Sequence, residues 1–295
     1  MFGRLVTAMV TPFADDLRLD VSRLEVLVEH LLATGTTALV VAGTTGESPT
    51  LTESERMTLC RETIRIVAGR VPVIAGTGSY STAEAEELTR EADEVGAAAF
   101  LQVAPYYNKP SQEGLYRHFC KVAQVTNKPI LLYNIPARTG VNLSVETIVR
   151  LSRVPNIVGV KESSGDFTQI SRIIAETPED FILYSGDDKY TLPILALGGA
   201  GVVSVASHVV GNAMTALIEA FFSRDVQSAM RRHHELMPLF EELFRTSNPV
   251  MVKTALAMID VPAGGVRQPL ADATPEERRG LRRILGQHVD LSTVH

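Results

Sequence analysis

The chain of 295 residues has only two cysteines, Cys60 and Cys120, and they lie far apart in the sequence. This scarcity excludes a disulfide framework, and no cysteine or histidine spacing typical of a zinc site occurs, so we expect no bound metal. Runs of basic residues are also lacking, and the net charge of -6 argues against a nucleic-acid-binding surface. The first predicted strand follows almost directly on the N-terminus, without the charged and then apolar pattern of a secretion signal. We therefore expect a cytoplasmic protein.

Residues 190–218 contain no Asp, Glu, Lys or Arg, and this stretch is long enough to span a bilayer. It contains Pro193 and four glycines, Gly198, Gly199, Gly201 and Gly211, and the period of its apolar residues changes along it. Such a pattern is typical of a helix, a turn, a buried strand and a loop in succession. We therefore predict that this segment does not span a membrane.

Short apolar runs alternate with amphipathic runs over most of the chain. The apolar runs predict strands at residues 4–10, 38–41, 72–75, 98–103, 129–133, 157–160, 181–184 and 201–205. The amphipathic runs predict helices at residues 21–32, 52–68, 81–94, 112–125, 145–151, 167–175 and 192–197. Strands that are apolar throughout and joined by helices indicate an α/β protein with a parallel sheet. Eight such units favour a closed (β/α)8 TIM barrel.

The strand signal stops after Gly211. From there through residue 285 the pattern predicts helices interrupted at Pro238, Pro249, Pro262 and Pro269. We therefore predict a C-terminal helical extension, with a catalytic barrel in residues 1–224 and a helical domain in residues 225–295.

In a barrel of this kind, the chemistry lies at the C-terminal ends of the strands. Lys161 ends the apolar run 157–160, where burial disfavours an ammonium ion, and a free amine can form a Schiff base with a ketone. Alternatively, Lys161 only marks the strand end and extends its charge to water. The turn Gly43-Thr44-Thr45-Gly46 offers two hydroxyls and several backbone N–H groups, which suit a carboxylate or a phosphate. It could also be a plain strand-to-helix turn.

Two further side chains lie at predicted strand ends on the same rim. Tyr133 ends a strand, and its hydroxyl could pass protons to and from a carbinolamine at Lys161, or be buried for structural reasons alone. Arg138 is expected on the loop that follows, where an arginine can bind a carboxylate through two hydrogen bonds or simply face the solvent.

Taken together, the motifs resemble the dihydrodipicolinate synthase family of class I aldolases, in the family's order and over essentially the whole chain. The motifs are Gly43-Thr44-Thr45-Gly46-Glu47-Ser48, Pro105-Tyr106-Tyr107-Asn108, Tyr133-Asn134-Ile135-Pro136-Ala137-Arg138-Thr139-Gly140, Gly159-Val160-Lys161-Glu162 and Ser185-Gly186-Asp187-Asp188. The first and the last recur in sister enzymes such as N-acetylneuraminate lyase, whereas the motif around Arg138 is more specific.

The resemblance implies condensation of pyruvate with aspartate 4-semialdehyde to 4-hydroxy-tetrahydrodipicolinate, on the route to diaminopimelate and lysine. Lys161 would form the imine with pyruvate C2. Thr44 and Thr45 would hold the pyruvate carboxylate, and Gly186 and Val205 would supply backbone contacts nearby.

The resemblance also implies a proton relay formed by Tyr133, Thr44 and Tyr107, and a carboxylate site for the semialdehyde at Arg138. In the family, the tyrosine at the Tyr107 position comes from the neighbouring subunit. We therefore expect a homo-oligomer, a tetramer built as a dimer of dimers. Because the imine is the electron sink, no metal and no organic cofactor is implied.

Two alternatives stay open. A related pyruvate-dependent lyase would act on a sugar acid or another aldehyde and would share Lys161, Tyr133 and the turn at Thr44, but such lyases generally have a non-basic residue at the Arg138 position. A more remote alternative is a barrel that binds a keto acid without turnover.

Members of the family that lysine inhibits bind it at a subunit interface below the active site. The matching positions, a possible effector site, are Ser48, Glu53, Arg56, Tyr80, Glu84 and Tyr106. Ser48, Glu84 and Tyr106 keep the family's residue types. At the other three positions, sensitive bacterial members typically have histidine, histidine and asparagine.

These three changes bear on regulation. Arg56 is a permanent cation that would repel the ammonium group of lysine, and it could pair with Glu84 and occupy the carboxylate that the ligand needs. Tyr80 would fill space that lysine requires, whereas Glu53 adds a carboxylate that could help. We predict weak or absent inhibition by lysine.

Overall fold

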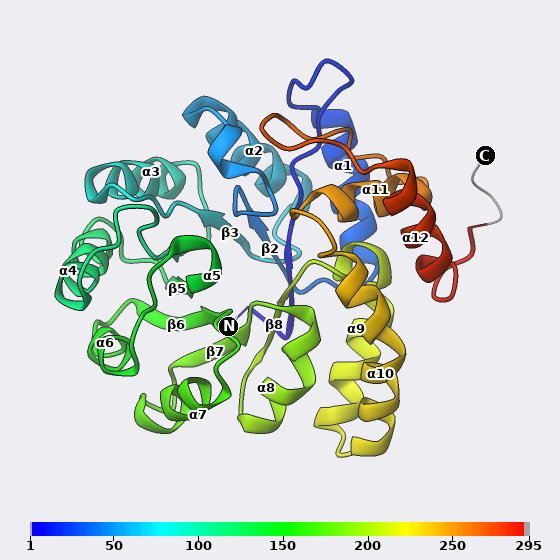
Figure 1. Ribbon diagram of the computed structural model, residues 1–295. Helices are drawn as coiled ribbons and strands as arrows, with labels where there is room; N and C mark the ends of the chain where they lie inside the picture. Colours follow the sequence, from blue (N-terminus) through cyan, green and yellow to red (C-terminus); the bar gives the residue numbers. More distant parts are fainter. Residues whose placement is uncertain (1, 292–295) are drawn as a thin grey trace.

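Eight short buried segments pair in parallel, each with the next, and the last pairs with the first. A closed barrel results within residues 2–291, the part of the chain that the computed structural model describes (Figure 1). The strands are Leu5–Ala8 (β1), Ala38–Val41 (β2), Val73–Gly76 (β3), Ala99–Val103 (β4), Ile130–Asn134 (β5), Ile157–Glu162 (β6), Ile182–Ser185 (β7) and Gly201–Ser204 (β8). The predicted (β/α)8 TIM barrel is confirmed.

Helices connect the strands and surround the barrel in Figure 1. The α-helices are Val21–Ala33 (α1), Glu53–Val67 (α2), Thr82–Glu94 (α3), Gln112–Ala123 (α4), Pro136–Thr139 (α5), Val145–Leu151 (α6), Phe167–Glu176 (α7), Thr191–Leu197 (α8), Ser207–Phe222 (α9), Val226–Glu242 (α10), Val250–Met258 (α11) and Pro275–Leu285 (α12). Two short 3-10 helices are Ser48–Thr50 (η1) and Asp188–Tyr190 (η2). Local sequence signals place many helix starts. At α2, for example, the Thr52 hydroxyl accepts from the N–H of Glu55, and the Glu55 carboxylate accepts from the N–H of Thr52.

The pleat of the strands divides the core into two layers. Ile74 and Leu131 point into the barrel and belong to one buried cluster, whereas Leu132 belongs to a larger cluster between the strands and the helices. The same alternation gives Tyr133 the inward direction, and the parallel register places Lys161 directly beside it. The regular pleat therefore brings these two side chains to the inside of the barrel, at the C-terminal ends of the strands.

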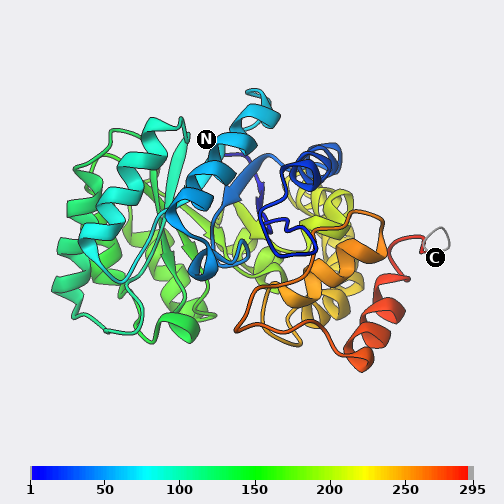
Figure 2. The same ribbon diagram turned by 90° about the horizontal axis from the view of Figure 1, so that it is seen from above.

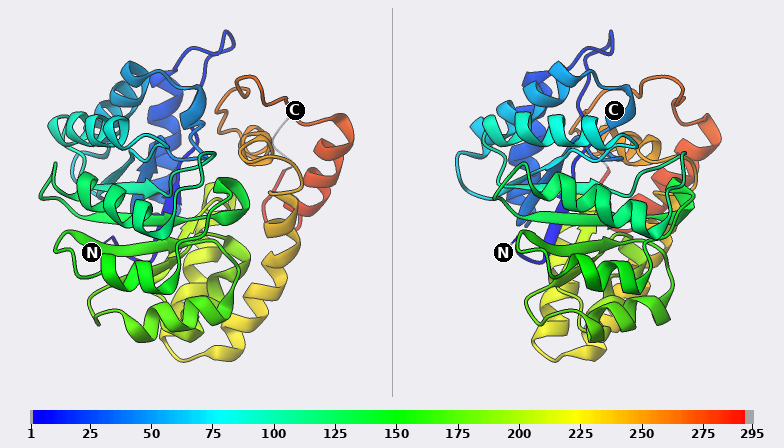
Figure 3. Two further views of the ribbon diagram at one scale, coloured as in Figure 1. Left: turned by 60° about the vertical axis from the view of Figure 1, so that its left-hand side comes forward. Right: turned by 90° about the vertical axis from the view of Figure 1, so that its left-hand side faces the viewer.

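The helices after β8 gather on one side of the barrel, drawn from yellow to red in Figures 1 and 2. Helix α10 packs along α9, and α12 packs against α10 and α11. Figures 2 and 3 also show the loop after β1 beside the segment that follows α11. There the N–H of Phe13 donates to the carbonyl oxygen of Ala263 at 3.0 Å. The C-terminal part of the chain therefore reaches the loops at the mouth of the barrel.

The predicted division into a barrel of residues 1–224 and a helical domain of residues 225–295 stays a prediction. Residues 1 and 292–295 of these ranges lie outside the described residues. The uncharged stretch 190–218 folds into η2, α8, β8 and most of α9. Among residues 2–291, no helix combines the length and the apolar character needed to cross a bilayer.

Two local expectations were wrong. Pro238 lies inside α10 instead of interrupting it. A proline removes one helix hydrogen bond, but the buried residues Leu236 and Leu239 continue the helical period across it, and their packing outweighs the loss. The loop expected at the end of the stretch 190–218 is instead the start of α9, which has a kink at Val210.

Candidate active site

Lys161 is part of β6, and its register partners are Tyr133 of β5 and Tyr184 of β7. Its side chain is only 5% exposed, and its Nζ atom lies over the Tyr133 ring, 4.2 Å from the ring centroid. The strand continues to Glu162, one residue beyond the lysine that was expected to follow its end. Because strands on both sides hold its backbone, the amine and the phenol meet in one fixed, desolvated geometry.

Gly186, at the end of β7, leaves the space that the Lys161 side chain occupies. A Cβ atom at this position would lie 3.0 Å from the Cε atom of Lys161 and closer still to the Oγ atom of Ser163. Any larger residue would displace one of these side chains. The N–H of Gly186 donates to the carbonyl oxygen of Glu162 at 2.8 Å, which keeps the end of β7 beside the lysine.

The turn after β2 presents its two threonines differently. Thr44 is half-buried and lines a small cavity that Tyr133 and the backbone of Gly43 and Gly76 also line. Thr45 is 3% exposed, and its Oγ1 atom accepts from Nδ2 of Asn248 at 2.8 Å. Thr44 therefore lies at the same cavity as Tyr133, whereas the Thr45 hydroxyl is anchored to the C-terminal part of the chain.

Glu47, the next residue but one, anchors the same turn a second time. Its buried carboxylate pairs with the Nζ atom of Lys253 in α11 at 2.6 Å and accepts from the N–H of Arg267 at 2.9 Å. Burial lowers the pKa of Lys253 to about 8, while Glu47 acts in the opposite direction by favouring the charged amine.

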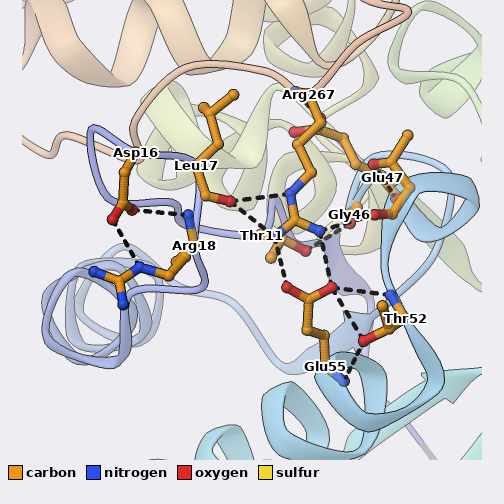
Figure 4. Close-up of polar contacts among 10 residues, drawn as sticks. Thr11, Asp16, Leu17, Arg18, Gly46, Glu47, Thr52, Glu55 and Arg267 are labelled. Atoms are coloured by element: carbon orange, nitrogen blue, oxygen red, sulfur yellow. Dashed lines mark hydrogen bonds and ion pairs between the residues drawn. The ribbon is translucent and has the colours of Figure 1, made fainter.

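Arg267 extends this anchor to the N-terminal loops, as Figure 4 shows. Its guanidinium donates to the carbonyl oxygen of Leu17 and forms an ion pair of 2.6 Å with Glu55. These hydrogen bonds from Arg267 lower the pKa of Glu55 to about 2. Beside them, the Thr11 hydroxyl donates to the carbonyl oxygen of Gly46 at 2.5 Å. The turn at residues 43–47 is thus held by segments from both ends of the sequence.

The backbone of Val205, after β8, is held by two buried titratable groups. Its N–H and that of Ala206 donate to Oδ2 of Asp188 at 3.0 and 2.8 Å. The Nε2 atom of His208 accepts from the N–H of Val10, so the ring proton is on Nδ1 and is donated to the Val205 carbonyl oxygen at 2.8 Å. Burial raises the pKa of Asp188 to about 6 and lowers that of His208 to about 4.

Tyr107 and Arg138 lie on the exposed rim. Tyr107 is 90% exposed and has a φ of 74°, which bulky residues rarely adopt, and its N–H donates to the Thr139 carbonyl oxygen at 3.3 Å. Arg138 lies on α5, a single helical turn rather than the expected loop, because Pro136 starts it and Gly140 ends it with a φ of 73°. Within residues 2–291 its guanidinium forms no hydrogen bond or ion pair.

Hydrogen bonds among buried polar groups hold together the two ends of the segment that carries Arg138. Glu162 points away from the barrel interior and accepts from Asn134 Nδ2 at 3.0 Å and from the N–H of Ser164 at 2.7 Å. Asn134 Oδ1 accepts in turn from the N–H of Leu143, so the two ends of the segment are tied together. Burial raises the pKa of Glu162.

Five of the six predicted effector residues lie together behind the turn. Nη2 of Arg56 donates to the carbonyl oxygen of Ser48 at 2.7 Å. The rings of Tyr80 and Tyr106 meet edge to face, with centroids 5.4 Å apart. Burial raises the pKa of Tyr106, and the charge of nearby Glu84 acts in the same direction.

Two contacts of this group differ from those that the sequence suggested, and the effector site itself stays a prediction. Glu53 does not join it but faces the outer surface beside Glu91 of α3. The pair between Arg56 and Glu84 is not formed in the described part of the chain, and Glu84 accepts from the Ser79 hydroxyl at 2.7 Å instead.

Sequence reasoning missed the residues that hold the turn at 43–47. Lys253 left a usable signal, because it is the only charged residue in the apolar segment Val250–Met258. Asn248 and Arg267 left none, since their partners lie about 200 residues away in the sequence. Asp188 belongs to a motif that was recognised, but its role in holding Val205 depends on the neighbouring strand.

Comparisons with known proteins agree on one family. Residues 1–288 match the model of the dihydrodipicolinate synthetase family. The chain is 52% identical over 284 residues to the 4-hydroxy-tetrahydrodipicolinate synthase of Moorella thermoacetica, covering 96% of this chain and 97% of that protein. The crystal structure of dihydrodipicolinate synthase from Bacillus anthracis matches with a TM-score of 0.96 and 49% identity, over 97% of this chain and 98% of that one. The enzyme from Cyanidioschyzon merolae, solved with lysine bound, matches with a TM-score of 0.94 and 47% identity, over 96% and 97%.

Proposed function

The chain belongs to the dihydrodipicolinate synthetase family, and from this premise we propose how its residues carry out the family's reaction. It is a lyase of the 4-hydroxy-tetrahydrodipicolinate synthase type, in the biosynthesis of diaminopimelate and lysine. It condenses pyruvate with aspartate 4-semialdehyde. The observation that carries the proposal is the buried amine of Lys161 over the Tyr133 ring, close to the turn with Thr44 and Thr45.

The reaction proceeds through an imine on Lys161. The amine attacks C2 of pyruvate, and the carbinolamine loses water to form the imine. The protonated imine withdraws electrons, so that C3 loses a proton and becomes the carbon of an enamine. This carbon forms a bond with the aldehyde carbon of the second substrate, whose oxygen takes up a proton. The amino group of that substrate then replaces the Lys161 nitrogen at C2, which closes the ring and releases the free Lys161 amine. No metal or organic cofactor is required, since the imine is the electron sink.

The pyruvate carboxylate is held by the hydroxyls of Thr44 and Thr45, with backbone groups of Gly186 and Val205 beside it. A hydroxyl-bearing turn with close backbone N–H groups suits an anion. The fixed position of Thr45 and the space that Gly186 leaves beside Lys161 support this assignment.

Tyr133, Thr44 and Tyr107 form the proton relay, and Tyr107 acts on the active site of a neighbouring subunit. An aromatic side chain that is 90% exposed and held in an unfavourable backbone conformation suits insertion into a partner. The assembly is a homo-oligomer, a tetramer built as a dimer of dimers. As a cytoplasmic biosynthetic enzyme it needs no nucleic-acid or membrane partner.

Subunit complementation tests the role of Tyr107. In a mixed dimer of Lys161→Ala and Tyr107→Phe subunits, one site has both Lys161 and the partner's tyrosine, so activity should return on mixing two weakly active variants. If Tyr107 acts within its own subunit, no site in the mixture is intact and mixing restores nothing.

Arg138 binds the carboxylate of aspartate 4-semialdehyde. Its exposed guanidinium, free of protein partners within residues 2–291, supports this role and argues against a sugar-acid lyase. For regulation, we propose that lysine, which the relative from Cyanidioschyzon merolae binds, is at most a weak inhibitor here.

Trapping of the imine tests the mechanism. Treatment with pyruvate and borohydride should add a reduced pyruvyl group to the peptide that carries Lys161, and Lys161→Ala should abolish both the label and nearly all turnover. The peptide with Lys253 is an internal control, because its amine is equally buried but paired with Glu47. A label on another lysine, or none in active enzyme, would contradict the mechanism.

A further inference from the structure

The hydroxyl of Thr45 has a single hydrogen bond to the described residues, and it is made by a residue far away in the sequence. Nδ2 of Asn248 donates to the Thr45 Oγ1 atom at 2.8 Å, and both residues are more than nine-tenths buried. Asn248 comes directly before Pro249, which caps α11, and thus belongs to the C-terminal helical part. A loop beyond the barrel therefore contacts one of the two hydroxyls proposed to hold pyruvate.

The direction of this hydrogen bond determines which further hydrogen bond the Thr45 hydroxyl can form. A hydroxyl has one proton and two lone pairs, and here the amide of Asn248 occupies a lone pair. The proton of Thr45 is therefore left to be donated elsewhere. A carboxylate can only accept hydrogen bonds, so it is the matching ligand. Accepting a hydrogen bond also polarises the hydroxyl and makes it a stronger donor.

The other end of the Asn248 amide points to a role beyond stability. Its Oδ1 atom is buried and has no hydrogen-bond partner among the residues that the structure describes. Leaving a buried polar atom unpaired is unfavourable, so an amide that is retained for stability would be expected to use both ends. Asn248 uses only the end that contacts Thr45.

The position of the amide is itself fixed. One turn further along α11, Lys253 pairs with Glu47 at 2.6 Å, two residues after Thr45. Asn248 and Lys253 therefore hold the same turn from one side, and the ion pair keeps the turn beside the amide. The donor and the acceptor are preorganised before any substrate arrives.

We propose that Asn248 is a positioning residue that directs the proton of the Thr45 hydroxyl toward the carboxylate of the keto-acid substrate. The inference rests on the proposed function, in which Thr45 contacts pyruvate. It makes the C-terminal helical part a determinant of how the first substrate is recognised, although Asn248 itself contacts neither the substrate nor Lys161.

The test compares the two substrates. Asn248→Ala should raise the pyruvate concentration needed for half-maximal imine trapping, and the KM for pyruvate, by about 10- to 30-fold. The KM for aspartate 4-semialdehyde should change little. Asn248→Asp has the same shape but offers only acceptors, so it accepts the hydrogen bond that the Thr45 hydroxyl would otherwise donate to pyruvate. It should raise the KM for pyruvate at least as much. This second variant also serves if Asn248→Ala does not fold.

A matched control lies elsewhere in the barrel. The Gln102 amide is fully buried, faces α3 and donates to the hydroxyls of Thr89 and Thr77 at 2.9 and 2.5 Å. Its oxygen likewise has no hydrogen-bond partner among residues 2–291. Gln102→Ala should lower the thermal unfolding temperature and leave the KM for pyruvate unchanged. A double-mutant cycle completes the design: with Thr45→Val present, Asn248→Ala should change the KM for pyruvate by less than about threefold.

Three results would overturn the inference: an unchanged KM for pyruvate in both Asn248 variants, equal increases for both substrates, or fully additive effects of the Thr45 and Asn248 changes. Failure of the proposed function is recognised separately. It appears in the wild-type enzyme as absent labelling of Lys161, whereas failure of the present inference leaves wild-type labelling and condensation intact.

Discussion

Two turns at the mouth of the barrel are built in opposite ways. The turn at residues 43–47 is largely buried and held by residues distant in the sequence: the side chains of Asn248 and Lys253 and the backbone N–H of Arg267. The helical turn α5 is held mostly by its own segment, where the Thr139 hydroxyl donates to the carbonyl oxygens of Ile135 and Val141. Its Arg138 extends into solvent.

In the proposed function, the two turns meet different substrates. The half of the site that holds pyruvate must place a keto group against an amine for covalent attack, and small errors of position are costly in such a step. The half that meets the second substrate needs to contribute one charge at the rim. In this proposal, the turn with the more distant supports lies where the covalent bond to the protein forms.

The largest effect should come from breaking the ion pair that holds the first turn. Lys253→Met leaves the buried Glu47 carboxylate without its cation, which should lower the free energy of unfolding by about 3–5 kcal/mol. Arg138→Ala, on the exposed turn, should change it by less than about 0.5 kcal/mol. Urea unfolding at one protein concentration measures both.

A double variant checks the cause of that loss. Glu47→Gln combined with Lys253→Met removes both charges and should recover part of the stability. If the double variant is no more stable than Lys253→Met alone, the uncompensated carboxylate is not the reason for the loss.

The reverse pattern should appear in catalysis when the exposed turn is changed. Arg138→Ala leaves the semialdehyde carboxylate without its partner and should cost about 2–5 kcal/mol in kcat/KM for that substrate. Imine trapping with pyruvate should remain near the wild-type level. Arg138→Lys keeps the charge but not the paired hydrogen bonds, and it should recover activity only in part. Normal condensation in Arg138→Ala would favour the sugar-acid lyase instead.

Stability should also depend on pH in a way that identifies the two buried titratable groups that hold the Val205 backbone. Asp188 has a pKa raised to about 6, so the folded protein binds its proton more tightly than the unfolded chain does. Its contribution to stability is therefore present at low pH and is lost as the pH rises from about 4 to 6. The free energy of unfolding of Asp188→Asn, relative to wild type, should thus rise by at most about 3 kcal/mol across this window.

His208 should contribute to stability with the opposite pH dependence, so it serves as the control. Its pKa is lowered to about 4, so its contribution is present above about pH 6.5 and is lost as the pH falls toward 4. The free energy of unfolding of a variant without His208, relative to that of the wild type, should therefore rise as the pH falls. Parallel pH profiles for the two variants would show that neither group titrates as its burial implies.

Local pattern predicted the barrel and the residues that stand at strand ends. The strand at residues 38–41 and the helix at residues 145–151 have their predicted bounds, since apolar period and a capping serine define them locally. Lys161 and Tyr133 were found because each ends an apolar run, and the strand register of the barrel then places them side by side. Their catalytic roles stay predictions.

Contacts between distant segments could not be predicted from such patterns. The amide of Asn248 meets Thr45 across 203 positions, and the guanidinium of Arg267 meets Glu55 across 212. Nothing in the residues around either partner indicates this. For the same reason the helix through Pro238 was missed, because tertiary packing and not local propensity maintains it.

The smallest expected effect is the inhibition by free lysine, at the predicted effector site behind the turn at residues 43–47. Arg56 donates to the carbonyl oxygen of Ser48 at 2.7 Å and so supports the turn from a third side. Tyr80 is half-exposed and packs edge to face on Tyr106, at the predicted effector position. We therefore expect the predicted effector position to be partly filled by the protein's own side chains.

We therefore predict that lysine changes the initial rate little at saturating pyruvate, even in the millimolar range. The ammonium group of lysine would meet Arg56, which is a permanent cation. Glu84, the carboxylate expected to bind this ammonium group, already accepts a hydrogen bond from the Ser79 hydroxyl. Glu53 lies away from it, beside Glu91. Arg56→His and Tyr80→Asn together remove the cation and open the space, so this double variant should become sensitive. Strong cooperative inhibition of the wild-type enzyme below millimolar lysine would show that Arg56 and Tyr80 move aside, and that the first turn is less rigidly held than its contacts indicate.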